Sequence, residues 1–359
     1  MKNGCIVARN IYDPISEKGM NAFISALIDG GYRLDKIFFL SDADEREFSQ
    51  TFAECKNFFE NVFVIAEGDK LPALRALACG ILKVQDSDEK RIGQGQKTFF
   101  FLENSPSLAA CVREEVAPFL DGKYGVKHDR LVVRAVGVPE EKLKAVLAEV
   151  KELCGNKLAF GISENGADVR IQIVYDADSP KMLTDEVMRV LVSGLNDYIY
   201  ALDDTPLNAC IYEMLKVRHL RLSVGESFTG GGVAKRLIEV PGISSVLFES
   251  VVAYDNGSKM KRLGVSAETL TKHGAVSDET AYEMAAGLLA SGNCNVSLAT
   301  TGIAGPQSDN TNKPVGLCYI AVGLDDAVYV YKYIFKGGRE AITARAIDQA
   351  LFLLYKQIK

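Results

Sequence analysis

The sequence lacks the cysteine and histidine patterns that hold metal ions. Its eight cysteines are scattered, with no C-x-x-C pair, and its three histidines, His128, His219 and His273, show no metal-ligand spacing. We therefore expect reduced, mostly buried thiols and no metal site. None of the histidines has an obvious partner serine, so a Ser-His-Asp triad is unsupported. A nucleophilic serine in this chain would need a lysine or another amine as its base.

The chain also lacks an excess of positive charge and a long apolar run. Its net charge is -6, which argues against a general nucleic-acid or anionic-membrane surface. No segment approaches the roughly 18 apolar residues of a membrane span, and the start MKNGCIVARNIYDPIS has no basic region followed by an apolar stretch. We expect a cytoplasmic protein that binds a small molecule. We expect it to bind neither nucleic acid nor membranes.

The length and composition predict a folded protein of two or three domains. The chain has 359 residues, of which 48% are hydrophobic and 25% charged. Apolar segments of strand and helix period alternate from Gly4 onward, which predicts a first α/β domain over residues 1 to about 130. After the first strand, the expected elements are a helix over 20–31, a strand over 35–40, a helix over 45–59, a strand over 61–66, a helix from Leu71 and a strand over 97–102.

A second, smaller module is predicted from about residue 131 to residue 203. Pro139 and two glutamates mark the start of a helix whose apolar residues recur at helical spacing to Leu153. The strand-like segment VRIQIVYDAD and the helix-like segment MLTDEVMRVLVSGLNDYIYA follow. This order predicts a β-α-β-α module, and it carries no catalytic signature of its own.

The last unit, from residue 204 onward, contains the densest run of glycines. It opens with a helix, PLNACIYEMLKVRH, and a strand, RLSVGES. Three segments then combine glycine with polar side chains: GESFTGGG at 225–232, SVVAYDNGSK at 250–259 and LATTGIAGPQSDNTNKPVGLCYIAV at 298–322. All three lie where predicted strands end, which is where α/β proteins place ligand sites.

Ser227 is the candidate nucleophile of the first segment. It lies on a strand-to-helix turn with Thr229 and glycines, including Gly230, so its hydroxyl can be exposed. The backbone N–H groups of the turn over 227–232 can then point at a ligand or a developing oxyanion. The alternative is that Ser227 or Thr229 caps the following helix, GGVAKRLIEV. The segment alone does not decide between them.

Lys259 is the candidate base of the second segment. It follows a predicted strand and an Asp-Asn-Gly turn, which would bring its amine back toward the strand ends. Partial burial would lower the pKa of the amine enough for it to accept a proton. Tyr254 could supply one wall of the site and a hydrogen bond. The alternative is a solvated surface lysine.

The third segment offers residues that could hold a substrate. In TTGIAGP, Thr301 ends a strand, and Gly302 and Gly305 let the backbone approach a ligand. The alternative is that these glycines only serve turn geometry. Arg339, in GGRE before the last helix, could hold a phosphate or carboxylate by paired hydrogen bonds.

Six segments in this order and spacing resemble the C-terminal domain of the competence/damage-inducible protein CinA family. They are GESFTGGG, YDNGSK, HGAVSDE, TTGIAGP, KPVG and GGRE, and the resemblance covers about residues 205–359. It implies an α/β/α domain that hydrolyses the carboxamide of nicotinamide mononucleotide to nicotinic acid mononucleotide and ammonia by a serine-lysine mechanism. It also implies no cofactor and a homodimer.

The resemblance implies a role for each matched residue. Ser227 would be the nucleophile, Lys259 the base and Tyr254 a further catalytic residue. Thr229, Gly230, Thr301, Gly302 and Arg339 would bind the substrate. At Phe228, Asp255, Gly257, Ser258, Gln307 and Ser308 the chain departs from the family's usual residues.

The resemblance extends more loosely to the other two units. The middle module is similar to the family's KH-like linker domain, but it has no G-x-x-G loop or basic face, so we expect a structural connector. The first domain occupies the place of a three-layer molybdopterin-binding-like domain, which in relatives can hydrolyse ADP-ribose with a divalent metal. Here ARNIYDPIS and AEGDKLPAL replace its motifs, and Asp13 and Asp69 alone do not group carboxylates for a metal.

Two alternatives to the amidase remain at the level of sequence. One is a metal-dependent ADP-ribose pyrophosphatase in the first domain, which we expect to be degenerate. The other is a non-catalytic protein of DNA uptake or damage response, whose C-terminal pocket senses a nucleotide without turning it over.

Overall fold

The computed structural model describes residues 1–10, 17–86, 89–155, 159–308 and 312–359. It is a mixed α/β protein with three sheets, which confirms the predicted α/β class. The chain divides into two compact units. The first comprises residues 1–130, 156–161 and 173–180, and the second comprises residues 131–155, 162–172 and 181–359. Among the described helices, none is both long and apolar enough to cross a bilayer.

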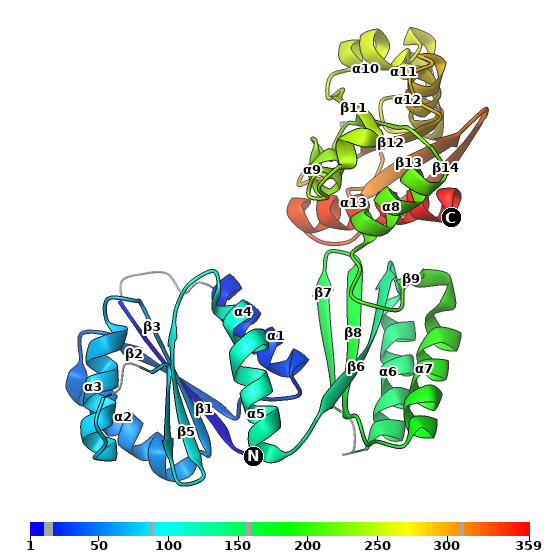
Figure 1. The fold of residues 1–359 in the computed structure, drawn as a ribbon. Helices are drawn as coiled ribbons and strands as arrows, with labels where there is room; N and C mark the ends of the chain where they lie inside the picture. Colours follow the sequence, from blue (N-terminus) through cyan, green and yellow to red (C-terminus); the bar gives the residue numbers. More distant parts are fainter. Residues whose placement is uncertain (11–16, 87–88, 156–158, 309–311) are drawn as a thin grey trace. The chain divides into compact units, whose positions relative to one another are not determined.

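The first sheet has the strand order β2-β1-β3-β5-β4. Its strands β1 (Asn3–Arg9), β2 (Lys36–Ser41), β3 (Asn61–Ala66) and β5 (Lys97–Glu103) are parallel, and β4 (Arg91–Gln94) is antiparallel. Helices α2 (Glu45–Phe58) and α3 (Leu71–Leu82) cover one face, as Figure 1 shows. The other face carries α1 (Glu17–Asp29), α4 (Leu108–Cys111), the π-helical turn η1 (Val112–Val116) and α5 (Ala117–Tyr124).

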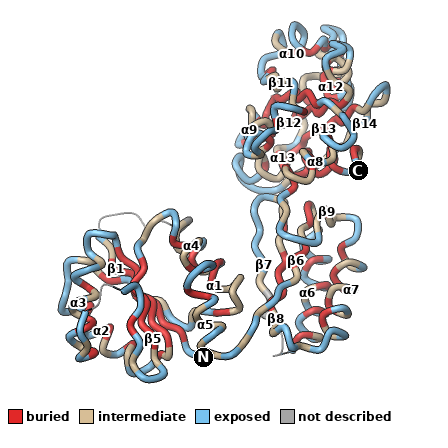
Figure 2. The backbone as a smooth tube through the Cα atoms, in the orientation of Figure 1, coloured by how far each residue is buried: buried red, intermediate tan, exposed pale blue. Residues whose placement is uncertain are grey.

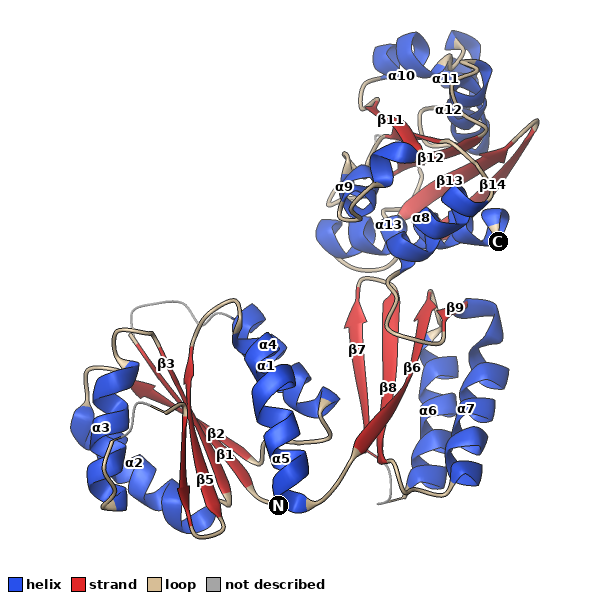
Figure 3. Ribbon diagram, viewed as in Figure 1, coloured by secondary structure: helices blue, strands red, loops and turns tan. Residues whose placement is uncertain are grey.

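The middle sheet has the order β7-β8-β6-β9. Its strands are β6 (His128–Val136), β7 (Ala159–Asn165), β8 (Asp168–Asp176) and β9 (Ile199–Ala201), and α6 (Glu140–Cys154) and α7 (Lys181–Leu195) lie together on one side of it (Figure 3). The short 3-10 helix η2 spans Asn196–Tyr198. The predicted β-α-β-α order missed β7 and β9. β7 escapes a pattern search because its few apolar residues are interrupted by Gly161 and followed by Ser163, Glu164 and Asn165, and β9 is only three residues long.

The C-terminal sheet has the order β11-β10-β12-β13-β14. Strands β10 (Leu222–Glu226), β11 (Leu247–Val252) and β12 (Val296–Gly302) are parallel, whereas β13 (Leu317–Leu324) and β14 (Ala327–Ile334) run antiparallel. Glu226 pairs with Val252 on one side and with Thr300 on the other. The carboxyl ends of the three parallel strands therefore meet at one edge, and all three predicted segments follow them.

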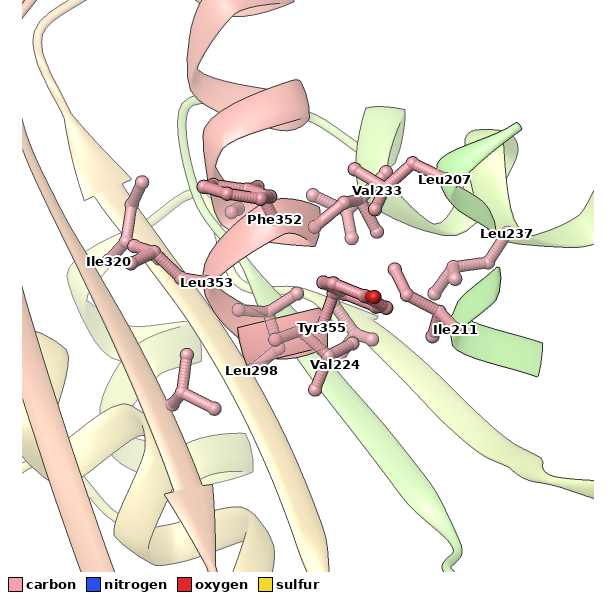
Figure 4. Packing of buried hydrophobic residues seen from close by; sticks show 14 of the residues in the cluster. Leu207, Ile211, Val224, Val233, Leu237, Leu298, Ile320, Phe352, Leu353 and Tyr355 are labelled. Carbon is pink, nitrogen blue, oxygen red and sulfur yellow. The ribbon is translucent and has the colours of Figure 1, made fainter. Parts of the chain in front are cut away.

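Helices cover both faces of the C-terminal sheet. One face carries α8 (Leu207–Val217), α9 (Gly232–Ile238) and α13 (Arg339–Ile358), with the 3-10 helix η3 (Ile243–Ser245) nearby. The other face carries α10 (Asn256–Leu263) and α12 (Asp278–Ala290), and α11 (Ala267–His273) packs on α12. Figure 4 shows the core between the C-terminal sheet and α8, α9 and α13. In it, Leu207, Val233 and Phe352 from the helices meet Val224, Leu298 and Ile320 from the strands.

Burial follows this layered arrangement. Figure 2 shows red, buried backbone along the central strands and pale blue, exposed backbone at the loops and outer helix faces. The core between the C-terminal sheet and α8, α9 and α13 also includes Val136 and Tyr200 of the middle module. The hydroxyl of Tyr355 on α13 donates to the carbonyl of Tyr200 at 3.1 Å. The middle module and the C-terminal sheet therefore share apolar packing within the second unit.

Candidate functional site

A cavity of about 230 Å³ lies at the carboxyl ends of β10, β11 and β12. It has a mixed lining of apolar and polar side chains, and none of the described residues in the lining is a carboxylate. Six of the predicted site residues line it: Ser227, Tyr254, Lys259, Thr301, Gly302 and Arg339. The remaining lining residues are Phe228, Ala275, Val276, Ile303, Ala304, Gly305, Gln307 and Ser308. The cavity thus combines an apolar wall with two basic side chains.

Ser227 lies on the turn that joins β10 to α9. It is 7% exposed, and its backbone N–H donates to the carbonyl of Thr300 at 3.0 Å. In the part of the chain that the structure describes, its side-chain hydroxyl makes no hydrogen bond within the protein. The residue at the N-cap of α9 is Gly231, without a side-chain cap. The capping alternative for Ser227 is therefore wrong, and its hydroxyl remains available to a ligand.

The start of α9 is occupied by a carboxylate that the sequence analysis did not single out. Glu226 is fully buried and accepts hydrogen bonds from the N–H groups of Gly231, Val233 and Ala234. The N–H groups of Gly230 and Gly232 donate to carbonyls of the same turn. This corrects the expectation that the whole turn over 227–232 offers N–H groups to a ligand. Glu226 ends β10, several residues before α9, so no sequence pattern signalled this role.

Only two N–H groups of that turn have no acceptor among the described residues. They belong to Phe228 and Thr229. Phe228 lines the cavity. Thr229 and Gly230 do not line it, and the Thr229 hydroxyl lies 2.7 Å from the Thr300 hydroxyl. The predicted contact of Thr229 and Gly230 with the substrate stays a prediction.

Lys259 is buried on the first turns of α10. Its side chain is 1% exposed, and its Nζ donates to the carbonyls of Ala253 at 3.0 Å and Tyr254 at 2.9 Å. Burial lowers the pKa of this amine below its ordinary value, and the nearby Asp255 carboxylate opposes that shift. Asp255 itself caps α10 through the N–H of Gly257. The surface-charge alternative for Lys259 is therefore wrong.

Arg339 and Tyr254 form a polar rim at the cavity. The guanidinium of Arg339, at the first residue of α13, donates to the carbonyl of Gly305 at 2.8 Å and to the Tyr254 hydroxyl at 3.3 Å. Tyr254 is 63% exposed. One arginine thus ties the loop after β12 to the loop after β11. A guanidinium has five N–H donors, so donors remain for an anionic ligand.

Hydrogen bonds from Thr301 and Lys313 hold another part of the cavity wall. The Thr301 hydroxyl donates to the carbonyl of Ala275 at 2.6 Å. The Lys313 amine donates to the carbonyls of His273 and Val276. Thr301 and Lys313 therefore fix the 273–277 loop, whose residues Ala275 and Val276 line the cavity.

Among its described residues, the first domain groups no carboxylates that could hold a metal ion. Asp69 is exposed and lies 4.0 Å from the Lys70 amine, and Asp13 lies outside the described residues. Across those described residues, no cluster of three or more His, Cys, Asp or Glu side chains could hold a metal ion.

The fold and the cavity define the class of the C-terminal part. It is a helix-covered α/β domain with a small-ligand cavity at the carboxyl ends of its parallel strands, lined by a serine and a buried lysine. Residues 204–358 match the model of the CinA C-terminal domain. The chain belongs to the CinA family.

Curated relatives support this membership over most of the chain. A competence-damage inducible protein of Clostridium acetobutylicum is 31% identical over 318 residues, which is 86% of this chain and 77% of that protein. One from Clostridium beijerinckii is 36% identical over 73% of this chain and 65% of its own length. A CinA-like protein of Fusobacterium nucleatum is 37% identical over 65% of this chain and 59% of its own. The chain thus spans less than two thirds of the latter two.

Solved structures also match the chain in part. The competence/damage inducible protein CihA of Agrobacterium tumefaciens is 34% identical, covers 45% of this chain and all of its own, and gives a TM-score of 0.41. The competence damage-inducible protein A of Klebsiella pneumoniae is 31% identical over 42% of this chain and 94% of its own, also with a TM-score of 0.41.

Proposed function

We propose that this chain is an amidohydrolase that converts nicotinamide mononucleotide to nicotinic acid mononucleotide and ammonia. Ser227 is the nucleophile and Lys259 is the base. The observation that carries the proposal is the state of Lys259: its amine is buried in the cavity that Ser227 also lines, and two backbone carbonyls hold it. A solvated lysine could not accept a proton near neutral pH.

The hydrogen bonds of Lys259 suit an uncharged amine. A neutral amine has two N–H donors and one lone pair. The carbonyls of Ala253 and Tyr254 accept the two donors, so the lone pair stays free to accept the Ser227 proton. The described residues that line the cavity include no carboxylate, and the nearby Asp255 only partly offsets the effect of burial on the amine. The local environment therefore favours the base form.

The reaction then follows the pattern of serine acyl transfer. Ser227 attacks the carboxamide carbon while Lys259 takes its proton. Lys259 gives that proton to the departing ammonia, and water hydrolyses the resulting ester with Lys259 again as base. The free N–H groups of Phe228 and Thr229 are the donors that the 227–232 turn can offer to the oxyanion. Each such donor is typically worth about 3 kcal/mol.

The rest of the cavity suits a pyridine nucleotide. Phe228, Val276 and Ile303 give an apolar wall for the ring, and Arg339 supplies a guanidinium for the phosphate. The proposal requires no metal or organic cofactor. We also propose, from the family resemblance, that the protein acts as a cytoplasmic homodimer.

The test is ammonia release from nicotinamide mononucleotide without added metal. We expect turnover by the wild type and a loss of at least ~1000-fold in Ser227→Ala and Lys259→Met. Lys261→Met is the matched control, because Lys261 is exposed on the same helix; it should keep wild-type activity. Wild-type protein that binds the nucleotide without turnover would instead favour the sensor alternative.

A further inference from the structure

Glu226 is linked to both proposed catalytic residues through its backbone. It is the last residue of β10 and directly precedes Ser227. Its own carbonyl accepts from the N–H of Ala253 at 2.8 Å. The carbonyl of Ala253 in turn accepts from the Lys259 amine at 3.0 Å. One residue therefore borders both the nucleophile and an acceptor of the base.

The side chain of Glu226 makes four hydrogen bonds in a fully buried position. Oε2 accepts from the N–H groups of Gly231 at 3.0 Å and Val233 at 3.1 Å, and Oε1 accepts from the N–H of Ala234 at 2.9 Å. The Ser250 hydroxyl of β11 donates to Oε1 at 3.3 Å. All four partners are donors. The site thus needs a group that accepts with both oxygens.

We propose that Glu226 is a positioning residue, whose carboxylate anchors the start of α9 and so sets the direction of the Ser227 hydroxyl toward Lys259. The turn over 227–230 spans the gap between the end of β10 and the N–H groups that Glu226 holds. Releasing those N–H groups lets the turn relax, since Gly231 at the N-cap has no side chain that could replace the carboxylate. This role rests on the proposed function for its kinetic readout.

Glutamine at this position separates shape from acceptor chemistry. Glu226→Gln keeps the side-chain volume. In the variant, however, an NH₂ group replaces one carboxylate oxygen, and it would face N–H or O–H donors that need an acceptor. A displacement of the nucleophile by about 1 Å can cost about 100-fold in rate. We expect Glu226→Gln to lower kcat ~10- to 100-fold, with the KM for nicotinamide mononucleotide within about twofold of the wild type.

The control is a destabilised α9 with its anchor intact. Leu237→Ala removes a fully buried side chain near the other end of the helix. Both variants are assayed below their melting temperatures. The proposal holds if kcat falls in Glu226→Gln and stays within about twofold of wild type in Leu237→Ala. Equal losses in both variants, or an unchanged kcat in Glu226→Gln, would overturn it.

Two additions keep the outcomes distinct. If Glu226→Gln does not fold, Ser250→Ala removes a single donor and should lower kcat about threefold at constant KM; no change overturns the proposal. If the wild type does not turn over the nucleotide, the labelling rate of Ser227 by a fluorophosphonate replaces kcat. Slower labelling in Glu226→Gln would then support the positioning role, although the substrate assignment would be wrong. If wild-type Ser227 is not labelled, both the positioning role and the proposed function are overturned.

Discussion

Arg339 shows how much of the site depends on the chemistry of single residues. Its guanidinium bonds two separate loops through Gly305 and Tyr254. An ammonium is a point charge on a flexible stem and cannot span both acceptors in a plane. The planar fork therefore does two tasks in the proposed site: it closes the rim and offers charge to a phosphate.

Replacing this arginine by lysine should weaken substrate binding more than chemistry. We expect Arg339→Lys to raise the KM for nicotinamide mononucleotide ~10-fold with a smaller effect on kcat, measured by steady-state kinetics. Arg345→Lys, on the same helix but outside the cavity lining, is the control. An unchanged KM in Arg339→Lys would remove the arginine from substrate binding.

At the scale of residues, the motifs pointed to the polar side chains of the cavity but missed Glu226, which holds the turn behind Ser227. Ser227, Lys259 and Tyr254 from the glycine-rich segments and Arg339 from GGRE before the last helix all line one cavity. Glu226 escaped notice, because a glutamate at the end of a strand gives no sign of whether it is buried. Which N–H groups of a turn are already bonded depends on coordinates that no residue pattern contains.

At the scale of elements, the placement of Lys259 depends on the packing of α10 against α12. Gly287 of α12 lies against the end of α10, and a Cβ at this position would overlap the carbonyl oxygen of Leu263. The glycine permits the close approach of the two helices. Because α10 carries Lys259, a shift of this helix moves the proposed base.

Gly287→Ala should therefore destabilise the second unit and impair activity together. We expect a loss of about 1–3 kcal/mol in the free energy of unfolding, measured with denaturant, and a reduced kcat. Gly122→Ala is the control, since this helical glycine of α5 has open space around its Cβ; alanine there should be neutral or stabilising. Wild-type stability of Gly287→Ala would contradict this account of the packing.

The contact between the middle module and α13 predicts a pH dependence. Asp348 accepts from the N–H of Ala167 at 2.8 Å and from Arg236 at 3.0 Å. Burial raises the pKa of the Asp348 carboxyl from 3.8 to about 6, against the opposing effects of these two donors. Between these values the folded state binds more protons than the unfolded state, so this residue's contribution to stability falls as pH rises.

Asp348→Asn should remove this pH dependence. The shift from 3.8 to about 6 corresponds to roughly 3 kcal/mol. We expect the free energy of unfolding of the variant, relative to wild type, to rise by up to that amount between about pH 4 and pH 7. Denaturant titrations at several pH values measure it. A difference that stays constant with pH would show that Asp348 does not titrate in this range.

Prediction of the elements succeeded where the periodic pattern was strong. The expected strand over 61–66 is β3, and the helix that starts after Pro139 is α6. β7 was missed because its sequence AFGISEN has only a short apolar alternation, which ends at Ser163, Glu164 and Asn165. β13 and β14 were also not predicted as an antiparallel pair, although only Asp325 and Asp326 separate them.

At the scale of the whole molecule, the proposed chemistry belongs to one unit. Every residue that lines the cavity lies in the second compact unit. The α/β class followed from alternating strand and helix periods along the chain. The shared core of the middle module and the C-terminal sheet could not be read in this way, because Val136 and Tyr200 carry no sign of which partner covers them.

Removal of metal ions should leave this activity unchanged. The described residues contain no carboxylate or histidine cluster suited to a metal, and the proposed mechanism uses only Ser227, Lys259 and backbone donors. We expect ammonia release to be the same before and after dialysis against EDTA. A loss that Mg²⁺ or Mn²⁺ restores would point to metal-dependent chemistry instead.

The most direct test of the account is the titration of the Lys259 amine in the folded protein. The Nζ resonance of ¹⁵N-labelled lysine is assigned by its absence from Lys259→Met and followed over pH. The account predicts a pKa below the ordinary lysine value of 10.5, because the amine is buried. A pKa at or above that value would mean that Lys259 stays charged at working pH, and it would contradict its role as the base.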